Sequence, residues 1–504
     1  MNMIVLFVIT SVAYFVYKQL RVPKEMRDIP GKSAWQWIVS MFQGNPNDVN
    51  IREMVLEQLR ETKLTRQWFP DKWVVMTSSW DSAQRIFNEL DLFPKNIPGS
   101  NNPEMFFSKF MGVNLVFSNG EVWKRQRKAV NPLFKRQTNI QVLSEVVNTF
   151  LGVVEKQKCK SIDMNKYTQR ITMDALGRSI MGTDFNSVEK ENVPFIDCYN
   201  KSVTHSGDPL YLIFSSLDRR SNPFRRPLFN TLDELEGHFN KILNAKRKLL
   251  QFGDREAIAN DPKTDLLTMM LIACEDEEND FNEKDIRDNC MIFLLAGHDT
   301  TAFTLTATLH FLAIYPEIQE KARQEVLDII GTNKIPTVEQ TKCMVYVNAL
   351  MKETMRLYPS VSRLPFRRVT KDTQLDGHFI PKDSEIVLDL YSMQRDPEYF
   401  DEPDRFIPER FYTTSGSSEN PILLEKKDPI GYAPFGGGTR SCIGMSFSLL
   451  EQKVVLSMLL SRYRFKYSPG HEPTDPDSPT SLKLLPSFFF ATDTAMFDFE
   501  PIDS

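Results

Sequence analysis

The stretch "PFGGGTRSCIGM", Pro434 to Met445, decides how the rest of the sequence is interpreted. It joins three consecutive glycines to an arginine, a cysteine and a further glycine. Two phosphate-binding motifs can be tested against this pattern. A P-loop requires a lysine after the glycines, which is absent here, and a dinucleotide fingerprint requires a third glycine where Ser441 stands. Both motifs fail on spacing, so we interpret the loop as something other than a phosphate site.

Cys442 differs from the other cysteines because its neighbours are glycines and an arginine. No two cysteines have the C-x-x-C spacing of a zinc site, and six cysteines in 504 residues are too sparse for a disulfide framework. The pattern favours a reducing compartment. The other five stand in apolar or mixed helical contexts and are interpreted as packing residues: Cys159, Cys198, Cys274, Cys290 and Cys343.

The spacing Phe435-x-x-Gly438-x-Arg440-x-Cys442-x-Gly444 resembles the haem-binding loop of the cytochrome P450 family in every position that defines that motif. The resemblance implies that the cofactor is haem b and that Cys442 is the metal ligand, giving its thiolate to the iron on the proximal side. It also implies that Phe435 covers the sulfur and that Arg440 pairs with a haem propionate. Gly438 belongs to a tight turn, and Gly444 lets the following helix approach the porphyrin.

Two charged motifs extend the resemblance. "KETMR" (352–356) places Glu353 and Arg356 three residues apart on one helical face, and "FIPERF" (406–411) supplies Arg410. By itself such a pair is common on solvated helix surfaces. The resemblance implies a Glu–Arg–Arg network that fixes the region around the cysteine loop and serves folding and haem retention.

The motif "LLAGHDTT" (294–301) places a glycine inside a long apolar helical pattern, where glycine costs about 1 kcal/mol relative to alanine. From the residues alone, ordinary helix packing explains the segment as well as a chemical role does. The resemblance implies that this helix crosses the distal haem face, where Ala296 and Gly297 leave room for O2. Asp299 and Thr300 would then be the catalytic acid–alcohol pair that delivers protons.

Further residues are implied to contact the haem propionates. In "WKRQR" (123–127) these are Trp123 and Arg127, and in "PFRRVTKD" (365–372) it is Arg367, with Arg368 as the alternative. The basic run from 124 to 128 also fits a solvated helix face. Four basic residues could form part of a patch for an acidic redox partner: Arg125, Lys128, Lys135 and Arg136.

The substrate pocket is the least defined part of the sequence. By resemblance its candidate residues are mostly apolar, which favours a lipophilic substrate such as a sterol or steroid, a fatty acid, a terpenoid or a xenobiotic. The candidates are Phe106, Phe107, Val116, Phe293, Thr301, Val361 and Leu364.

Amphipathic helical patterns dominate the chain, and strand-like runs are short. We therefore predict a mostly α fold with a minor β-sheet. No repeat or long linker divides residues 32–504, which predicts a single catalytic domain. The resemblance implies a cytochrome P450 fold, with the haem between the long distal helix and the proximal cysteine loop. Predicted helices cover 121–134, 161–182, 232–251 and 316–330, and predicted strands cover 73–77, 378–390 and 464–469.

The N-terminal run "MIVLFVITSVAYFVY" (3–17) is apolar and uncharged. As a helix it would be roughly 22 Å long, near the lower limit for crossing a bilayer core of roughly 30 Å. The basic residues that follow it predict a cytoplasmic catalytic domain. We expect a membrane anchor over 1–22 and a proline-containing hinge over 23–31, with single-pass placement in the endoplasmic reticulum membrane. A cleaved signal peptide is the alternative.

The formal net charge of −5 argues against a nucleic-acid partner. The resemblance implies a haem-thiolate monooxygenase that uses O2 and receives electrons from NADPH through NADPH–cytochrome P450 reductase, with cytochrome b5 as a further candidate partner. Two alternatives stay open: an isomerase or dehydratase of the same fold, and a haem-binding electron carrier or sensor without turnover. The acid–threonine pair favours the monooxygenase, because neither alternative needs a proton relay.

Overall fold

The computed structural model describes residues 17, 20–69, 72–96, 102–136, 139–208, 210–211, 214–274, 281–416, 421–476, 478, 481–485 and 490–502. The predicted anchor over 1–22 lies outside the described residues except for Tyr17 and residues 20–22. Within the described ranges, no helix combines the length and the apolar character that a membrane crossing requires. The hinge contains a short 3-10 helix, η1 (Lys24–Met26).

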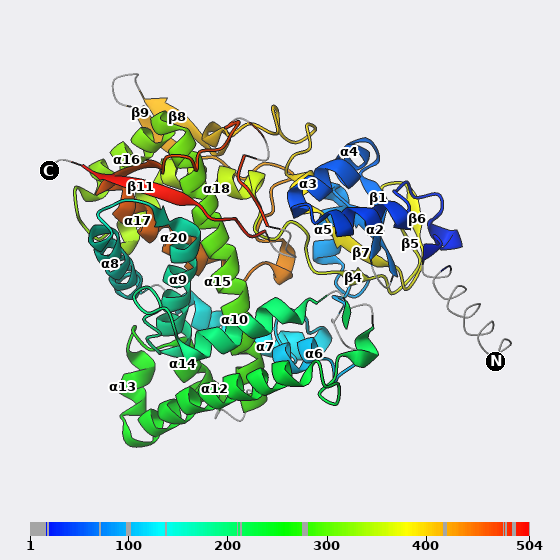
Figure 1. The fold of residues 1–504 in the computed structure, drawn as a ribbon, viewed down its shortest axis with the longest axis horizontal. Helices are drawn as coiled ribbons and strands as arrows, with labels where there is room; N and C mark the ends of the chain where they lie inside the picture. The colour runs from blue at the N-terminus through cyan, green and yellow to red at the C-terminus, as the bar shows by residue number, and fades with distance from the viewer. Residues whose placement is uncertain are drawn as a thin grey trace.

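The longest described helix, α15 (Glu283–Ile314), crosses the middle of the molecule (Figure 1). It begins with a capping box, in which the Asn282 side chain accepts from the Asp285 backbone and the Asp285 side chain accepts from the Asn282 backbone. Most of its side chains are buried, because other helices pack around it. These neighbours are α6 (Phe106–Met111), α9 (Met164–Leu176), α14 (Leu266–Cys274), α16 (Pro316–Ile330), α18 (Val345–Leu357) and α20 (Met445–Leu460).

The remaining helices surround this centre and the main sheet. Those between residues 120 and 343 are α7 (Gly120–Arg136), α8 (Ile140–Lys156), α10 (Pro194–Ser206), α12 (Arg226–Phe252), α13 (Arg255–Asn260) and α17 (Val338–Cys343). Those near the sheet are α2 (Ala34–Gln43), α3 (Asn47–Ile51), α4 (Glu57–Thr62), α5 (Trp80–Asn88) and α19 (Leu390–Met393). The short 3-10 and π turns include η2 (Arg52–Leu56), η3 (Gly177–Met181), η4 (Ser215–Leu217), η5 (Pro408–Phe411) and η6 (Gly438–Arg440).

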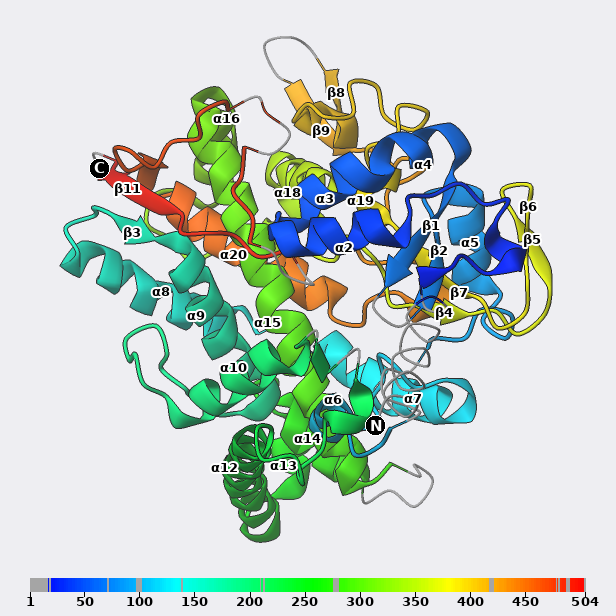
Figure 2. The same cartoon turned by 45° about the vertical axis from the view of Figure 1, so that its right-hand side comes forward.

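The main sheet has the strand order β1-β2-β7-β4. Its strands are β1 (Leu64–Phe69), β2 (Lys72–Thr77), β7 (Glu385–Leu388) and β4 (Arg367–Arg368). The β2–β7 pair is parallel, with Val75 opposite Ile386, and the other two pairs are antiparallel. Figure 2 shows this sheet and α2 to α5 on one side of α15, with α8 and α9 on the other side.

Three smaller sheets complete the fold, with orders β10-β11-β3, β5-β6 and β8-β9. Their strands are β3 (Ile162–Asp163), β5 (Thr373–Leu375), β6 (His378–Ile380), β8 (Tyr412–Gly416), β9 (Pro421–Glu425), β10 (Tyr463–Tyr467) and β11 (Met496–Pro501). The predicted class, mostly α with a minor sheet, is confirmed. One predicted helix is wrong at its start, since Ile162 pairs with Phe497 and the Asp163 side chain caps α9.

Candidate functional site

The glycines of the cysteine loop are required by its packing against α5. Gly438 has a φ of +62°, and a side chain there would come within 2.6 Å of the Phe87 carbonyl oxygen. A Cβ on Gly437 would lie 2.4 Å from the Phe87 ring. Both positions therefore exclude any residue with a side chain, the first because of its left-handed backbone as well. These contacts hold the loop against the helix that follows β2.

Cys442 is held at the end of this loop by backbone hydrogen bonds. Its N–H donates to the Phe435 carbonyl at 3.0 Å, and its sulfur accepts from the N–H groups of Gly444 and Met445. Burial raises the pKa of the thiol, while these two donors and the charges of Arg127 and Lys95 oppose that rise. The side chain nevertheless has exposed surface. A cysteine that protein surrounds and that still has exposed surface can be reached by a bound group.

α15 contributes a second accessible position in the interior. Ala296 is exposed although the residues before it, Phe293 to Leu295, are buried. Gly297 does not share this role, since a Cβ there would lie 2.9 Å from the Leu176 side chain of α9. The expectation that Gly297 leaves room for O2 is therefore replaced by a packing explanation. Its glycine lets α9 and α15 approach closely.

The acid–alcohol pair lies one turn further along α15. The Thr300 hydroxyl donates to the Ala296 carbonyl at 2.6 Å. The Asp299 carboxylate is 31% exposed, and its Oδ1 lies 2.9 Å from Nδ1 of the buried His298. That nitrogen makes no hydrogen bond with Asp299 despite the short distance. The Asp299 carboxylate is therefore accessible, while the Thr300 hydroxyl is bonded to its own helix.

Arg440 lies over the Trp123 ring, with its guanidinium carbon 4.0 Å from the ring centroid. Its Nη2 donates to the Ser118 carbonyl at 2.7 Å and to Asn119 Oδ1 at 3.2 Å, whereas its buried Nε has no partner. Burial, together with the charge of Arg367 and a smaller effect of Arg127, lowers the pKa of Arg440 to about 9. Trp123 and Arg440, which the resemblance assigned to the haem propionates, are thus in contact.

The alternating side-chain directions along strand β4 decide between Arg367 and Arg368, which the sequence left as alternatives. Arg367 is buried and donates from Nη1 to the Phe93 carbonyl at 3.1 Å, and burial lowers its pKa to about 10. Arg368 is exposed and pairs with Asp383 at 2.8 Å. Successive strand residues point to opposite faces, so only one of the two can face the interior. That residue is Arg367.

Four cations converge near the cysteine loop without a carboxylate partner among the described residues: Lys95, Arg127, Arg367 and Arg440. Lys95 forms an antiparallel bridge with Arg367. Burial and the charges of Arg367 and Arg440 hold the pKa of Lys95 well below its usual value. Arg127 donates to the Ser441 carbonyl at 3.1 Å. Uncompensated charges of one sign that are buried or partly buried are costly, so the cluster is suited to an anionic ligand.

Lys95 is the functional candidate that sequence reasoning missed. It stands alone in "FPKN" (93–96), outside any motif, and only the bridge to Arg367 reveals its place. The observations on this site fit a haem: an accessible cysteine, an accessible alanine on α15, and cations for two propionates.

The Glu–Arg–Arg network is assembled as expected, and two of its members are fully buried. Arg356 Nε and Nη2 donate to the two Glu353 oxygens at 2.7 and 2.8 Å. Arg410 Nε lies 3.3 Å from Glu353 Oε1, which also accepts from the Ile407 N–H at 2.8 Å. Gln394 extends the network, since its side chain donates to the Arg356 carbonyl and accepts from the Ala433 N–H. Ala433 directly precedes the cysteine loop.

The predicted pocket residues divide into two groups. Phe106 stacks on Phe110 and meets Phe229 edge-on, and Phe293 meets Phe134 edge-on, so both are buried in the core. Thr301 is 1% exposed and hydrogen-bonded to α20. These three side chains do not line an accessible space. The other four are partly exposed: Phe107, Val116, Val361 and Leu364.

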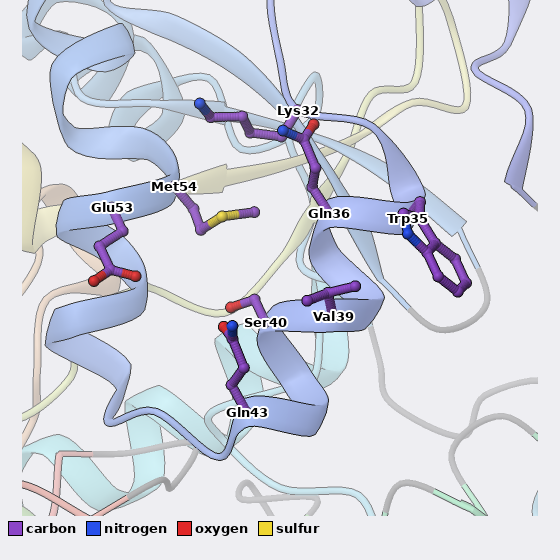
Figure 3. Close-up of a pocket in the computed structure, with 8 residues that line it drawn as sticks. All are labelled: Lys32, Trp35, Gln36, Val39, Ser40, Gln43, Glu53 and Met54. Atoms are coloured by element: carbon purple, nitrogen blue, oxygen red, sulfur yellow. The ribbon is translucent and has the colours of Figure 1, made fainter.

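A separate groove of about 240 Å³ lies between α2 and η2 (Figure 3). It contains none of the predicted site residues. Its lining residues are Lys32, Trp35, Gln36, Val39, Ser40, Gln43, Glu53 and Met54.

Comparisons with known proteins show which proteins this chain is similar to. A family model described as "Cytochrome P450" matches residues 29–490. "Cytochrome P450 4c21" of Blattella germanica is 30% identical over 392 residues, which cover 75% of each chain. "Cytochrome P450 3A2" of Rattus norvegicus is 30% identical over 404 residues, covering 75% of this chain and 76% of the relative. A solved structure titled "Crystal structure of cytochrome P450DA heme domain" covers 94% of this chain and 97% of its own, with a TM-score of 0.77 at 19% identity, a likeness of fold.

Proposed function

Because the chain belongs to the cytochrome P450 family and is a haem monooxygenase, we propose that it inserts one oxygen atom of O2 into a lipophilic small molecule. The substrate classes are a sterol or steroid, a fatty acid, a terpenoid or a xenobiotic. The observation that carries the proposal is the accessible Cys442 sulfur, held by two backbone N–H groups inside the protein. The apolar, partly exposed residues Val116, Val361 and Leu364 support a lipophilic ligand.

The residues of the site divide the work of holding the cofactor. Cys442 would ligate the iron through its sulfur, and Phe435 and the Gly438 turn would shield and orient that sulfur. Arg127, Arg367 and Arg440 would neutralise the propionates, with Trp123 supporting Arg440; we add Lys95 to this set. When bound, the haem supplies oxygen activation, and a thiolate ligand favours cleavage of the O–O bond.

The protein's part in the chemistry is proton delivery. We assign it to Asp299, whose partly exposed carboxylate can exchange protons with solvent, and to Thr300, whose hydroxyl can pass a proton onward. In this structure the Thr300 hydroxyl donates to the Ala296 carbonyl. To donate a proton in the reaction, the hydroxyl must rotate away from that carbonyl. Ala296 leaves the adjoining surface open.

Replacing Thr300 with alanine should leave the thiolate spectrum intact and divert electrons to peroxide. We expect the peroxide formed per NADPH oxidised to rise, with product formation falling about a hundredfold, the lower range for loss of a positioned proton donor. Thr300→Ser, which keeps the hydroxyl, is the matched control. Full coupling in Thr300→Ala would contradict the proton role.

Arg367 and Arg368 offer a matched pair for the propionate assignment. Arg367→Ala should speed haem transfer to apomyoglobin about tenfold or more, because a charge-assisted hydrogen bond of about 1.5–3 kcal/mol is lost. Arg368→Ala should leave the transfer rate unchanged, since that side chain pairs with Asp383 on the surface. Equal rates in the two variants would remove Arg367 from the site.

For electron supply we propose NADPH–cytochrome P450 reductase, with cytochrome b5 as a further donor. The exposed lysines Lys128 and Lys135 of α7 support docking of an acidic partner. Arg125 is not included in the proposed docking patch, because it pairs with the buried Asp285 at 3.1 Å. We further propose placement in the endoplasmic reticulum membrane with the catalytic domain, residues 32–504, in the cytoplasm; the apolar run over 3–17 supports an anchor.

The test of the proposed function is NADPH consumption by the purified full chain with reductase and a panel of one sterol, one steroid, one fatty acid and one terpenoid. Product carrying one atom of ¹⁸O2 is the expected result. Turnover without NADPH would identify an isomerase or dehydratase. Haem reduction with neither product nor NADPH-dependent O2 consumption would identify an electron carrier.

A further inference from the structure

A hydrogen bond joins α15 to α20. Thr301 Oγ1 and Ser448 Oγ lie 2.8 Å apart. Gln452, one turn further along α20, donates from Nε2 to the same Ser448 oxygen at 3.1 Å. Thr301 and Gln452 are each 1% exposed, and Ser448 between them is partly buried. The two helices thus share a short, partly buried polar chain.

Thr301 differs in this respect from most other threonines of α15, although the Thr306 hydroxyl also lies 2.8 Å from that of Thr168 on α9. The hydroxyls of Thr300, Thr304 and Thr308 each donate to the carbonyl four residues earlier in the same helix. Such bonds add nothing to the position of the helix relative to other elements. Thr301 instead bonds to Ser448 of another helix. Its hydroxyl therefore restrains the relative placement of the two helices.

The two ends of this bond adjoin the two halves of the site. Thr301 directly follows Asp299 and Thr300 on α15. Ser448 lies in the first turn of α20, where its N–H donates to the Gly444 carbonyl at 2.9 Å. The N–H of Gly444 in turn donates to the Cys442 sulfur. A short bonded path therefore connects the cysteine to the segment that carries the acid–alcohol pair.

We propose that Thr301 and Ser448 are positioning residues that set the Asp299–Thr300 segment relative to the cysteine end of α20. The proposal rests on the proposed function for its chemical consequence, though the helix contact stands without it. Loss of the bond lets α15 move at this turn, which misplaces the Thr300 hydroxyl. Proton delivery then suffers although Thr300 and Asp299 are both present.

The test uses Thr301→Val, which keeps the shape of the side chain and removes its hydroxyl. Ser448 keeps its bond from Gln452 in this variant, so no buried group loses its last partner and folding should survive. Thr301→Ser restores the hydroxyl and is the rescue variant. Ser448→Ala removes the bond from the other side, and the double variant Thr301→Val with Ser448→Ala tests whether both act through one contact.

Two readouts are measured on the full-length holoprotein. The first is amide hydrogen exchange of α15 around residues 297–304. The second is the ratio of peroxide to water formed from O2 when NADPH and reductase are supplied without substrate, since peroxide uses two electrons and water four. Each should rise about fivefold in Thr301→Val and in Ser448→Ala, the factor expected for one hydrogen bond of ordinary strength. The double variant should match the single variants, and Thr301→Ser should match the unmodified chain.

Unchanged exchange and an unchanged peroxide-to-water ratio in Thr301→Val would overturn the proposal. A lower unfolding temperature with an unchanged ratio would do the same, because it would show a contribution to stability alone. So would failure of Thr301→Ser to restore both values. If the unmodified chain lacks NADPH-dependent O2 consumption, the proposed function fails, while the exchange measurement still decides whether the bond restrains α15.

Discussion

Cys442→Ala should abolish the thiolate spectrum and all NADPH-dependent oxygenation. The sulfur accepts hydrogen bonds from the N–H groups of Gly444 and Met445, and alanine has no atom that could ligate iron in its place. In this variant the cations Arg367 and Arg440 can still bind the haem propionates, so we expect the protein to retain part of its haem without a sulfur ligand. Absorption spectra and haem content per chain measure both effects.

Cys343 provides the matched control for this variant. It is exposed at the end of α17, and among the described residues its sulfur donates to the Glu339 carbonyl of the same helix. Cys343→Ala should keep the spectrum and the activity of the unmodified chain. Retention of the thiolate spectrum in Cys442→Ala, or its loss in Cys343→Ala, would contradict the assignment of the ligand.

Arg356→Ala should destabilise the protein by about 3–5 kcal/mol, the range for breaking a buried ion pair by removing one partner. Arg356 uses all five donors of its guanidinium, on Glu353 and on the carbonyls of Gln394, Pro403 and Arg405. Its removal takes two charge-assisted hydrogen bonds from the buried Glu353 carboxylate, which keeps Arg410 and the Ile407 N–H on one oxygen. Denaturant unfolding measures the loss, and we expect poor haem incorporation to accompany it.

A surface pair with the same spacing supplies the control. Lys124 and Glu121 are 63% and 87% exposed in their side chains. Glu121→Ala should change the free energy of unfolding by no more than about 0.5 kcal/mol, because exposed pairs contribute little. Arg356→Lys should fail to rescue, since lysine cannot reproduce the planar donor set. A small effect of Arg356→Ala, similar to that of Glu121→Ala, would show that the network has no structural importance.

Much of the site could be predicted because short motifs fix local geometry. The loop from Phe435 to Gly444 is held by hydrogen bonds between backbone groups a few residues apart, such as that from the Cys442 N–H to the Phe435 carbonyl. The spacing of the motif residues is therefore enough to indicate where Cys442 lies. The "KETMR" motif likewise places two partners on one helical face. Such contacts depend on the local backbone, which the sequence pattern specifies.

Other features depend on contacts between distant segments. Gly297 is explained by Leu176 of another helix, and Thr301 by Ser448, so neither could be assigned from the "LLAGHDTT" motif. Lys95 acquires its place through a bridge to Arg367, far along the chain. Phe106 resembled a pocket residue because it is apolar, but an apolar side chain fits a core equally well. Only tertiary packing separates the two.

The spectrum of the reduced, carbon-monoxide-bound protein tests the central claim most directly, because the position of its Soret band depends on the ligand opposite carbon monoxide. The full chain is purified with haem, reduced with dithionite and exposed to carbon monoxide. The red-shifted Soret band of a thiolate ligand is the predicted result. A band at the shorter wavelength typical of a histidine or neutral thiol ligand, in freshly prepared protein at neutral pH, would contradict Cys442 as the thiolate that holds the iron.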